Sequence, residues 1–523
     1  TLSKEFKKAP NMIADELLKK IKPTKNISKI EVKGPYLNFF INRELLNEQV
    51  ITKILKEKND YGLALKKKEK VMIEYSQPNT HKAFHVGHLR NVCMGDSLIR
   101  ILKNKGYNVI AANYIGDVGA HIAKCLWYYK KHFKGQIPKN NKGEWLGELY
   151  TKAVKKLKEK EAYKEEVSEI LKQLESEKNN EIIALWKQTR KWSLDEFKEI
   201  YDWLGANFDI YFYESDVEKS GKQLVEKYKK KGLFVKSEGA LIMDLKKYDL
   251  DVFLVLKSDG TSLYSTKDLS LAVKKFEEYK IDQSLYVVGS EQKMYFKQLF
   301  KTLELMGFKN AKNCKHVSYE LVMLPDGKMS SRAGNIMLFS ELKNEIMKKL
   351  EKEVIKRHKD WSMKKVDETA KKIGLGALKF GMLNQDSNRV IIFNLNEWLS
   401  FEGETGPYIQ YAVARINSIF KKSKGVIGEV NYSMLKSAEE QLLISKLADY
   451  PKLVENSADN LRPSMIARYL LELAQGFNEF YHKHQVLKAD SEVRGARMAL
   501  IISIKQVLKN GLSLLGIEAP DEM

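Results

Sequence analysis

The sequence of residues 76–88 is Ser76-Gln77-Pro78-Asn79-Thr80-His81-Lys82-Ala83-Phe84-His85-Val86-Gly87-His88. Before it, residues 71–75 form a short β-rich run. After it, the apolar side chains of residues 87–105 recur at helical spacing, and residues 109–115 are again typical of a strand. The order strand, helix, strand is the unit of a parallel α/β sheet. We therefore expect residues 76–88 to link a strand to a helix N-terminus.

Two histidines in this segment, His85 and His88, are candidate catalytic residues. The start of a helix favours a phosphate, because its first backbone N–H groups are unpaired and its dipole is positive there. Two imidazoles three residues apart can both face that phosphate and donate to a charge that grows in a transition state. Gly87 has no side chain, so a flat adenine could lie against its backbone. The alternatives are a zinc pair or two surface histidines, and no further Cys/His cluster supports zinc.

A second segment reads Leu324-Pro325-Asp326-Gly327-Lys328-Met329-Ser330-Ser331-Arg332-Ala333-Gly334-Asn335. Its composition is that of a loop, with glycines on both sides and cations at Lys328 and Arg332. A cationic loop of this kind can close over a triphosphate and neutralise a leaving pyrophosphate. Taken alone, the segment fits a solvated basic turn equally well.

Length, charge and cysteine content indicate the number of domains, the kind of partner and the cellular compartment. A chain of 523 residues is too long for one core and suggests three or four domains. Its net charge of +22 suits a polyanion such as nucleic acid, although Lys-rich chains arise without such a partner. The three cysteines form no paired motif, and we find no signal peptide and no apolar run long enough for a membrane span. We expect a cytoplasmic protein, not attached to a membrane, with reduced thiols. The chain starts at Thr1, as a fragment would.

The patterns along the chain predict a multidomain protein. Its centre is an α/β Rossmann-like parallel-sheet catalytic domain, in two halves at residues 49–125 and 237–361. Strand-like segments at 240–245, 252–256 and 284–288 are expected to return to that sheet. Residues 126–236 form a helical insertion, because 147–205 have long-helix composition without internal Pro. Residues 362–523 form an all-α domain, and residues 1–48 a small α+β unit.

The two quoted segments together resemble the H-x-G-H and K-M-S-K-S signatures of class I aminoacyl-tRNA synthetases. Their order and their separation by an insertion also match. The second segment departs from the pattern, because Ser331 stands where the signature has its second lysine. Arg332 and Lys82 could supply the missing charge.

Further blocks resemble arginyl-tRNA synthetases in particular. They lie at residues 74–76, 113–117, 258–268, 287–292 and 403–412. Three positions depart from that family: Gln77 replaces a usual small residue, Val118 a common Trp, and Tyr295 a common His. We expect these differences to affect packing and to leave the activity in place.

The resemblance implies roles for individual residues. The residues that stabilise phosphoryl charge would be His85, His88, Lys328, Lys82 and Arg332. ATP would be bound by His85, Gly87, His88, Lys328, Met329, Ser330 and Ser331. A guanidinium is a planar fork of donors best held by carboxylates, and the arginine-binding residues carried over are Glu74, Asn79, Tyr264, Asp268 and Gln292. Without the resemblance, Tyr264 and Asp268 would read as a strand-edge tyrosine and a helix N-cap.

The outer domains resemble tRNA-binding parts of the same family. Residues 362–523 resemble an anticodon-binding domain, and residues 1–48 the end of the domain that holds the tRNA elbow, with its front half missing. The tRNA-binding residues this implies are Asn38, Phe39, Tyr408, Gln410, Tyr411 and Arg415. For Tyr408, Tyr411 and Arg415, which recur at helical spacing, the alternative is that they form one side of an interhelical contact.

The expected reaction is ATP-dependent attachment of L-arginine to tRNA(Arg) through arginyl-adenylate, with AMP and pyrophosphate as products. Mg²⁺ enters with ATP, no protein-bound metal is expected, and the family implies a monomer. Arginine activation that requires bound tRNA is a further family expectation. The alternatives are another class I synthetase, a nucleotidyltransferase for a small metabolite, and an RNA-binding relative without catalysis. The cysteinyl enzyme would need a cysteine-rich zinc pocket, which the sequence lacks.

Overall fold

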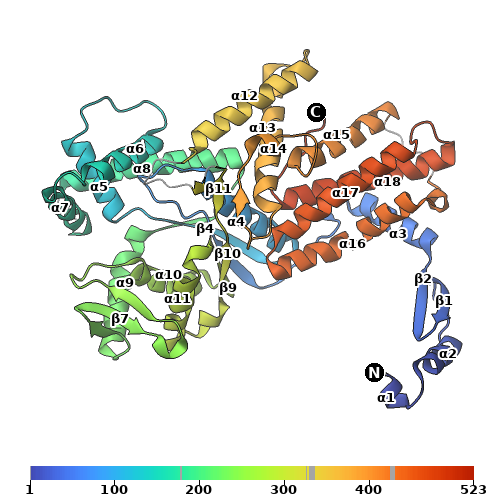
Figure 1. The fold of residues 1–523 in the computed structure, drawn as a ribbon, viewed down its shortest axis with the longest axis horizontal. Helices are drawn as coiled ribbons and strands as arrows, with labels where there is room; N and C mark the ends of the chain where they lie inside the picture. Colours follow the sequence, from blue (N-terminus) through green and yellow to red (C-terminus); the bar gives the residue numbers. More distant parts are fainter. Residues whose placement is uncertain (1, 177–179, 326, 329–335, 425–429) are drawn as a thin grey trace.

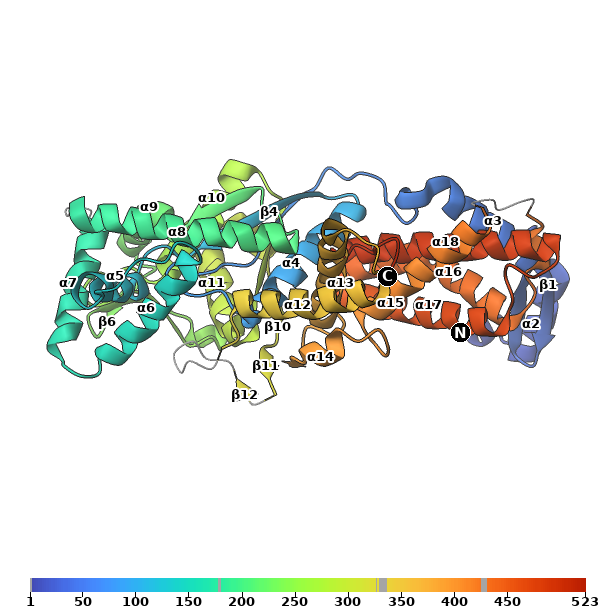
Figure 2. The same cartoon turned by 90° about the horizontal axis from the view of Figure 1, so that it is seen from above.

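The computed structural model describes residues 2–523 except 177–179, 326, 329–335 and 425–429. The molecule is elongated, with a group of helices at one end, a parallel sheet in the middle and a second helical body at the other end (Figures 1 and 2). The N-terminal segment projects from the second helical body as a small separate unit (Figure 1).

The central sheet is parallel and has five strands in the order β10-β9-β3-β4-β5. β3 (Lys70–Glu74) is in the middle, with β4 (Asn108–Ile115) and β5 (Ile210–Tyr213) on one side and β9 (Gln283–Gly289) and β10 (Cys314–Tyr319) on the other. The chain order reverses at β3. In open parallel sheets, ligands bind outside the carboxyl ends of the strands at such a reversal. The predicted parallel sheet is confirmed, and residues 76–88 directly follow β3.

Two strand assignments of the sequence analysis are wrong. β7 (Ala240–Asp244) and β8 (Val252–Leu256) do not return to the central sheet, but form a separate antiparallel sheet with β6 (Val235–Ser237). In addition, the edge strand β5 lies inside the range assigned to the helical insertion. A four-residue strand that follows a long helical stretch has too little sequence for its period to stand out.

Helices cover both faces of the sheet. α4 (Val86–Asn104) packs on one face and shares a core with the C-terminal helices. On the other face, α10 (Tyr264–Tyr279) and α11 (Lys293–Leu305) share a core with the small antiparallel sheet and with α9 (Glu214–Lys230). The layers therefore place the carboxyl edge of the sheet between α4 and α10.

The helical insertion is confirmed. Its helices are α5 (Ala120–Lys131), α6 (Lys142–Lys156), α7 (Ala162–Ser176) and α8 (Asn180–Leu204). They have small hydrophobic cores of their own around Trp127 and Tyr150 and occupy one end of the molecule (Figure 1).

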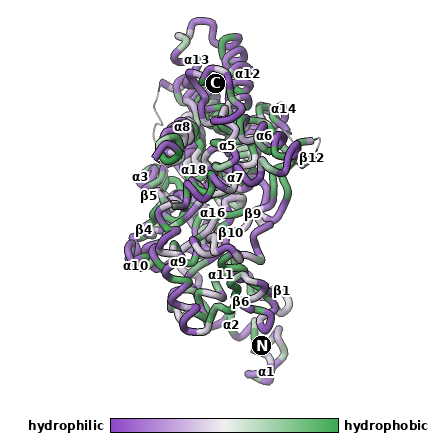
Figure 3. Tube along the Cα trace, turned by 90° about the vertical axis from the view of Figure 1, so that its left-hand side faces the viewer, coloured by the Kyte–Doolittle hydropathy of each residue, from purple (hydrophilic) through white to green (hydrophobic). Residues whose placement is uncertain are grey.

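The C-terminal body is almost entirely helical, as predicted. The described part of the chain from residue 339 onward contains one short strand, β13 (Ile391–Ile392), which pairs with β11 (Val322–Leu324). The connection between α12 (Phe339–Arg357) and α13 (Met363–Leu383) is hydrophilic at its tip (Figure 3). The helices are α12 (Phe339–Arg357), α13 (Met363–Leu383), α14 (Leu395–Trp398), α15 (Gly406–Lys422), α16 (Ala438–Asn460), α17 (Pro463–Lys483) and α18 (Ser491–Leu514).

The N-terminal unit consists of α1 (Leu2–Phe6), α2 (Pro10–Lys20) and an antiparallel hairpin of β1 (Ile27–Lys33) and β2 (Tyr36–Ile41). The helix that follows, α3 (Arg43–Glu57), packs against α16 and α18 of the C-terminal body. Among the described residues, no helix is both long enough and apolar enough to cross a bilayer.

Arg90 of α4 joins the domain of the parallel sheet to the segment that leads into the C-terminal helices. Its fully buried guanidinium donates to the backbone oxygens of Glu320 and Arg389, both at 2.7 Å, and of Asp386 at 3.0 Å. The carboxylate of Asp386 in turn accepts from Arg462 at 2.7 Å, just before α17. A buried cation that meets three carbonyls is stabilising only while all of them stay paired.

Replacement of Arg90 by methionine should test this connection. Arg90→Met keeps most of the side-chain volume but leaves three carbonyls without their donor, so the free energy of unfolding should fall by roughly 3 kcal/mol or more. The matched control is Arg462→Met, whose half-exposed ion pair with Asp386 should contribute no more than about 1 kcal/mol. Urea unfolding followed by tryptophan fluorescence measures both. Equal losses in the two variants would contradict the assignment.

Candidate active site

The loop after β3 is held in an unusual backbone conformation. Ser76, Gln77 and His81 have φ angles of 73°, 49° and 61°, in the left-handed region that side-chain-bearing residues seldom adopt. The side chain of Asn91 accepts from the Ser76 amide at 2.6 Å, and that of Asn113 accepts from the Gln77 amide at 3.1 Å. Residues of α4 and β4 thus stabilise a strained loop at the carboxyl edge of the sheet, as is common at functional sites.

The two signature histidines stand at the beginning of α4. Nδ1 of His85 accepts from the Gly87 amide, and Nδ1 of His88 accepts from the His85 amide, both at 3.1 Å. Burial and the nearby Lys82 lower the pKa of His85 to about 4, and burial together with His85 holds the pKa of His88 well below its usual range. Both rings are therefore neutral near pH 7. Because Nδ1 accepts, each ring carries its proton on Nε2 and can donate it to an anion.

The second signature segment is tied to the first by backbone hydrogen bonds. The Val86 amide donates to the carbonyl of Met337 at 3.1 Å, and the Phe339 amide donates to the carbonyl of Phe84 at 3.0 Å. These bonds bring the end of the second segment to the beginning of α4. β12 (Gly327–Lys328) pairs with β11, which places the backbone of Lys328. The predicted residues Met329, Ser330, Ser331 and Arg332 lie outside the described residues.

His81 and Lys82, which precede the two signature histidines in the sequence, lie in different surroundings. His81 is fully buried, and its ring nitrogens lie 3.0 Å from the Thr80 hydroxyl and 2.8 Å from the Thr189 hydroxyl, so it serves to fix the loop. Lys82 lies with its ammonium 5.6 Å from the centre of the Tyr150 ring, on the side of the helical insertion. Its predicted catalytic role remains a prediction.

Three carboxylates gather at the carboxyl edge of the sheet. Glu74 ends β3, Glu214 begins α9, and Asp268 lies in the second turn of α10. Lys275 donates to Glu74, and Lys267 lies 2.7 Å from Glu214, so these two acids are paired with buried cations. Glu74 is 4% exposed and also accepts from Gln77 at 2.9 Å. Its side chain is thus already paired within the protein, although it was predicted to meet a ligand.

Asp268 is the carboxylate of this group that has no cation as its hydrogen-bond partner among the described residues. Its hydrogen-bond partner in this part of the chain is the neutral hydroxyl of Tyr295, which donates to Oδ2. Burial, together with the charges of Glu74 and Glu214, raises the pKa of Asp268 to about 7, even though the Tyr295 hydrogen bond and Lys275 act to lower it. A cationic ligand would relieve this unfavourable charge.

The remaining predicted arginine-binding residues lie around the same edge. Asn79 pairs with Gly116 across the loop, and a Cβ on Gly116 would lie 2.2 Å from the Asn79 Oδ1. Tyr264, at the start of α10, is 55% exposed, and Gln292 is exposed at the end of the 3-10 turn Ser290–Gln292. The structure therefore brings the predicted set to one edge of the sheet, although their contacts with arginine remain predictions.

Glu214 is a residue of this edge that the sequence analysis missed. It follows β5, the strand hidden in the range assigned to the helical insertion. Its neighbour Ser215 is anchored by the buried Asp117, which accepts from the Ser215 amide at 2.9 Å and from its hydroxyl at 2.7 Å. The signal that could have revealed Glu214 is the β-rich run Ile210–Tyr213 directly before it.

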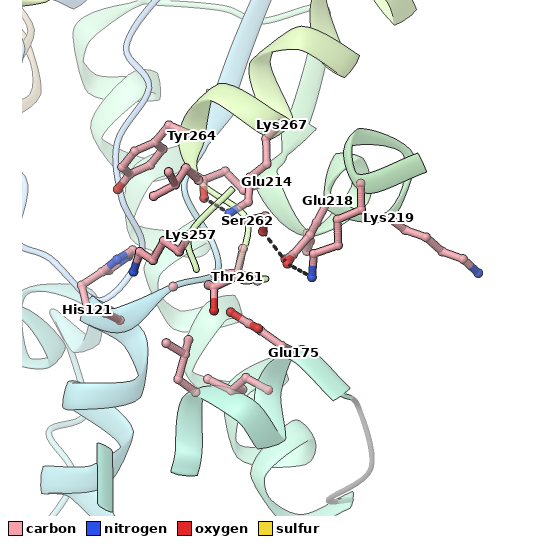
Figure 4. Close-up of a pocket in the computed structure, with 18 of the residues that line it drawn as sticks. His121, Glu175, Glu214, Glu218, Lys219, Lys257, Thr261, Ser262, Tyr264 and Lys267 are labelled. Atoms are coloured by element: carbon pink, nitrogen blue, oxygen red, sulfur yellow. Dashed lines mark hydrogen bonds and ion pairs between the residues drawn. The ribbon is translucent and has the colours of Figure 1, made fainter. Parts of the chain in front are cut away.

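A cavity of about 680 Å³ opens between this edge and the helical insertion. Tyr264, Lys267 and Glu214 face it from the sheet side and His121 from α5 (Figure 4). Nε2 of His121 is buried and makes no hydrogen bond within the described part of the chain. Six lysines and three glutamates line the cavity, so its walls carry a net positive charge that suits an anion.

The predicted tRNA-contacting residues have unequal positions. Asn38 and Phe39 are exposed on β2. The Tyr408 hydroxyl accepts from Asn478 of α17 at 2.8 Å. Gln410 is fully buried, and its amide group donates to the carbonyls of Lys372 at 2.9 Å and Glu518 at 2.6 Å. The prediction that Gln410 contacts tRNA is therefore wrong, because its side chain joins α13 to the end of the chain.

Arg415 also takes part in an interhelical contact. Its guanidinium donates to Asn478 at 2.8 Å and lies over the rings of Tyr411 and Tyr481, at 4.7 and 5.6 Å. Tyr408 and Arg415 therefore make the interhelical contact that was the alternative to tRNA binding. Both side chains remain partly exposed to solvent. No group of three or more His, Cys, Asp or Glu residues within the described ranges could hold a metal ion.

The parallel sheet, the paired histidines at a helix start and the joined second segment define a class I aminoacyl-tRNA synthetase catalytic domain. A family model described as tRNA synthetases class I (R), catalytic domain, matches residues 50–395. The DALR anticodon binding domain matches 409–523, and the arginyl tRNA synthetase N terminal domain matches 1–41. The chain belongs to the arginyl-tRNA synthetase family.

Individual relatives agree with this assignment. The chain is 40% identical to an arginine--tRNA ligase of Bdellovibrio bacteriovorus over 100% of its own length and 91% of that protein. It is also 40% identical to an arginine--tRNA ligase of Clostridium botulinum, covering 92% of it. Among solved structures, the Thermus thermophilus arginyl-tRNA synthetase matches with a TM-score of 0.85 at 27% identity, over 100% of this chain and 93% of the other.

The close approach of Asn79 to Gly116 can be tested directly. Gly116→Ala should displace the Asn79 side chain, because the new methyl group would occupy its place, and we expect the KM for arginine to rise by about tenfold or more. Arginine-dependent ATP–pyrophosphate exchange measures this KM. The control is Gly476→Ala in α17, where the added methyl would meet Leu443 at 3.3 Å, far less tightly. An unchanged KM in Gly116→Ala would show that Asn79 does not hold arginine.

Proposed function

We propose that the chain attaches L-arginine to tRNA(Arg) in an ATP-dependent reaction through arginyl-adenylate. The observation that carries the proposal is Asp268, a carboxylate with no cationic hydrogen-bond partner in the described ranges, at the ligand-binding edge of the sheet. A guanidinium presents a planar fork of donors that fits a carboxylate bidentately. Lysine lacks that fork and would leave buried acceptors unpaired, so arginine is the amino acid that this charge favours.

The first step is activation of the amino acid. The arginine carboxylate attacks the α-phosphate of ATP, which enters with Mg²⁺, and pyrophosphate leaves. The Nε2–H groups of His85 and His88 are suited to donate to the phosphate oxygens as their charge grows, and Gly87 leaves room for the adenine. Lys328 and Arg332, with Met329, Ser330 and Ser331 between them, would act on the triphosphate, and Lys82 would support them. The step needs no protein nucleophile, so positioning and electrostatics account for it.

The amino acid would be held by the residues around Asp268. Asn79 and Gln292 would bind its amino and carboxylate ends, and the Tyr264 hydroxyl would lie beside the guanidinium. Glu74 would act mainly through Lys275, since that ion pair already satisfies its charge. Glu214 adds negative potential to the same place.

The second step transfers the arginyl group to the tRNA. A terminal ribose hydroxyl attacks the carbonyl of the adenylate and AMP leaves. The cavity beside Tyr264 would receive the 3′ end, because its net positive charge suits a phosphate backbone and Tyr264 belongs both to its wall and to the proposed arginine-binding set. Nε2 of His121, which lies in its wall and has no hydrogen-bond partner among the residues that the structure describes, would contact a ribose hydroxyl.

The rest of the tRNA would lie along the outer domains. Asn38 and Phe39 of the exposed hairpin would meet the elbow, and Tyr408, Tyr411 and Arg415 would meet the anticodon region. We expect the protein to act as a monomer in the cytoplasm, where charged tRNA is consumed.

The reaction is tested by ATP–pyrophosphate exchange with each amino acid in turn, with and without bulk tRNA. We expect exchange with arginine only, and a dependence on tRNA if activation is coupled to tRNA binding. Exchange with a different amino acid would overturn the substrate and leave the class of enzyme intact. No exchange under any condition would overturn the catalytic proposal and favour an RNA-binding role.

The pKa of Asp268 predicts how arginine binding depends on pH. The carboxyl group titrates near pH 7 in the free protein, and the guanidinium requires its ionised form, so binding at lower pH must release a proton. The Kd for arginine should rise about tenfold per pH unit below 7 and level off above it. Calorimetry in two buffers at pH 6 should detect about one proton released per arginine. Release of protons should vanish at pH 8.5, and a Kd that does not change between pH 6 and 8 would refute the assignment.

A further inference from the structure

We infer that Tyr295 is a positioning residue for arginine recognition: its hydroxyl orients the Asp268 carboxylate and keeps it ready to meet the guanidinium. The inference rests on the proposed function of Asp268. It also corrects the expectation that the difference at residue 295, where the family commonly has His, affects only packing.

The contact of Tyr295 with Asp268 joins two helices. Asp268 lies on α10 and Tyr295 on the first turn of α11, and the phenolic O–H donates to Asp268 Oδ2. The Tyr295 ring is itself fixed, because it packs against Phe253 and Phe296 with ring centres 5.7 and 5.5 Å away. A fixed donor on one oxygen restricts rotation of the carboxylate. The carboxylate plane is then fixed, and Oδ1 remains available to accept from a guanidinium. A bidentate contact requires such a fixed plane.

The hydrogen bond also acts on the charge of Asp268. Burial and neighbouring acids favour the protonated form, and a donor to a carboxylate favours the ionised form. Among the described residues, Tyr295 donates a hydrogen bond to the Asp268 carboxylate. Lys275 lowers the pKa of Asp268 only through its charge, and its ammonium is paired with Glu74. The titratable groups that face Asp268 are Glu74 on β3, Tyr114 on β4, Glu214 on α9, Tyr264 and Lys275 on α10, Tyr286 on β9 and Tyr295 on α11.

A structural role and a positioning role for Tyr295 predict different dependences of the KM for arginine on pH. If Tyr295 only fills space, its loss should raise the KM for arginine by the same factor at every pH. If its hydroxyl keeps Asp268 ionised, its loss should shift the titration of Asp268 to higher pH. A hydrogen bond to a charged group corresponds to a shift of about one to two pH units. The loss of arginine affinity would then be large at neutral pH and would diminish in alkaline buffer.

The experiment measures the KM for arginine in ATP–pyrophosphate exchange from pH 6 to 9.5, with saturating ATP and tRNA, for the full chain and its variants. In Tyr295→Phe we expect the inflection of the profile to move up by at least about one pH unit, with a KM roughly tenfold higher at pH 7 and close to that of the unaltered chain at pH 9.5. Tyr295→His restores a donor and should return the inflection toward its original value. The matched control, Tyr279→Phe, removes a phenolic hydroxyl from the far end of α10 and should leave the profile unchanged.

A second replacement guards against a folding defect. Incorporation of 3-fluorotyrosine at position 295 keeps the shape of the ring and makes its hydroxyl a stronger donor, so the inflection should move to lower pH. An unchanged inflection in both Tyr295→Phe and the fluorinated protein, or an increase in KM that is equal at every pH, would overturn the inference. Failure of the unaltered chain to activate arginine would instead overturn the proposed function, so the two failures are distinguishable.

Discussion

The architecture depends on a single buried helix, α4. Its N-terminus carries His85 and His88, and the rest of its length lies between the parallel sheet and the helices of the C-terminal body. A helix this deeply buried needs partners for its polar side chains. Asp96 is paired with Lys379 at 3.2 Å, and the two terminal nitrogens of Arg90 donate to three backbone carbonyls, whereas its Nε has no hydrogen-bond partner among the described residues. One element therefore positions His85 and His88 and also packs against the helices of the domain that matches the DALR anticodon binding family.

The proposed amino-acid site also depends on how buried charges are paired. Three carboxylates at one edge of the sheet would repel one another, and two of them are stabilised by Lys267 and Lys275. Asp268 is left with a neutral hydroxyl as its hydrogen-bond partner, which is unfavourable in the free protein and favourable once a guanidinium arrives. A guanidinium binds the ionised form of Asp268, so a larger ionised fraction before binding gives a higher affinity. A neutral donor such as Tyr295, which favours the ionised form, would therefore have a specific role.

The sequence predicted much of the catalytic core for identifiable reasons. Residues 76–88 lie between a strand and a helix with clear periods, so the loop, the sheet and the place of the histidines followed from local pattern. Short strands were harder to predict. β5 was not recognised, because its four residues directly follow the long α8 in the sequence. β7 and β8 were assigned to the wrong sheet, because a sequence pattern shows that a strand exists and not which strand it pairs with. Gln410 was misjudged because its polar side chain suggested a ligand, whereas it binds backbone carbonyls inside the helical body.

By itself, the sequence determined the class of protein, the order of its domains and the chemical types available at the site. These follow from local spacing, composition and motif, which do not depend on distant contacts. Only the tertiary structure decided which charges remain unpaired. Glu74 and Asp268 were equal candidates in the sequence, yet Lys275, about two hundred residues from Glu74 along the chain, reaches the first and not the second. Pairing of charges is a property of distances between remote residues, and only folding sets those distances.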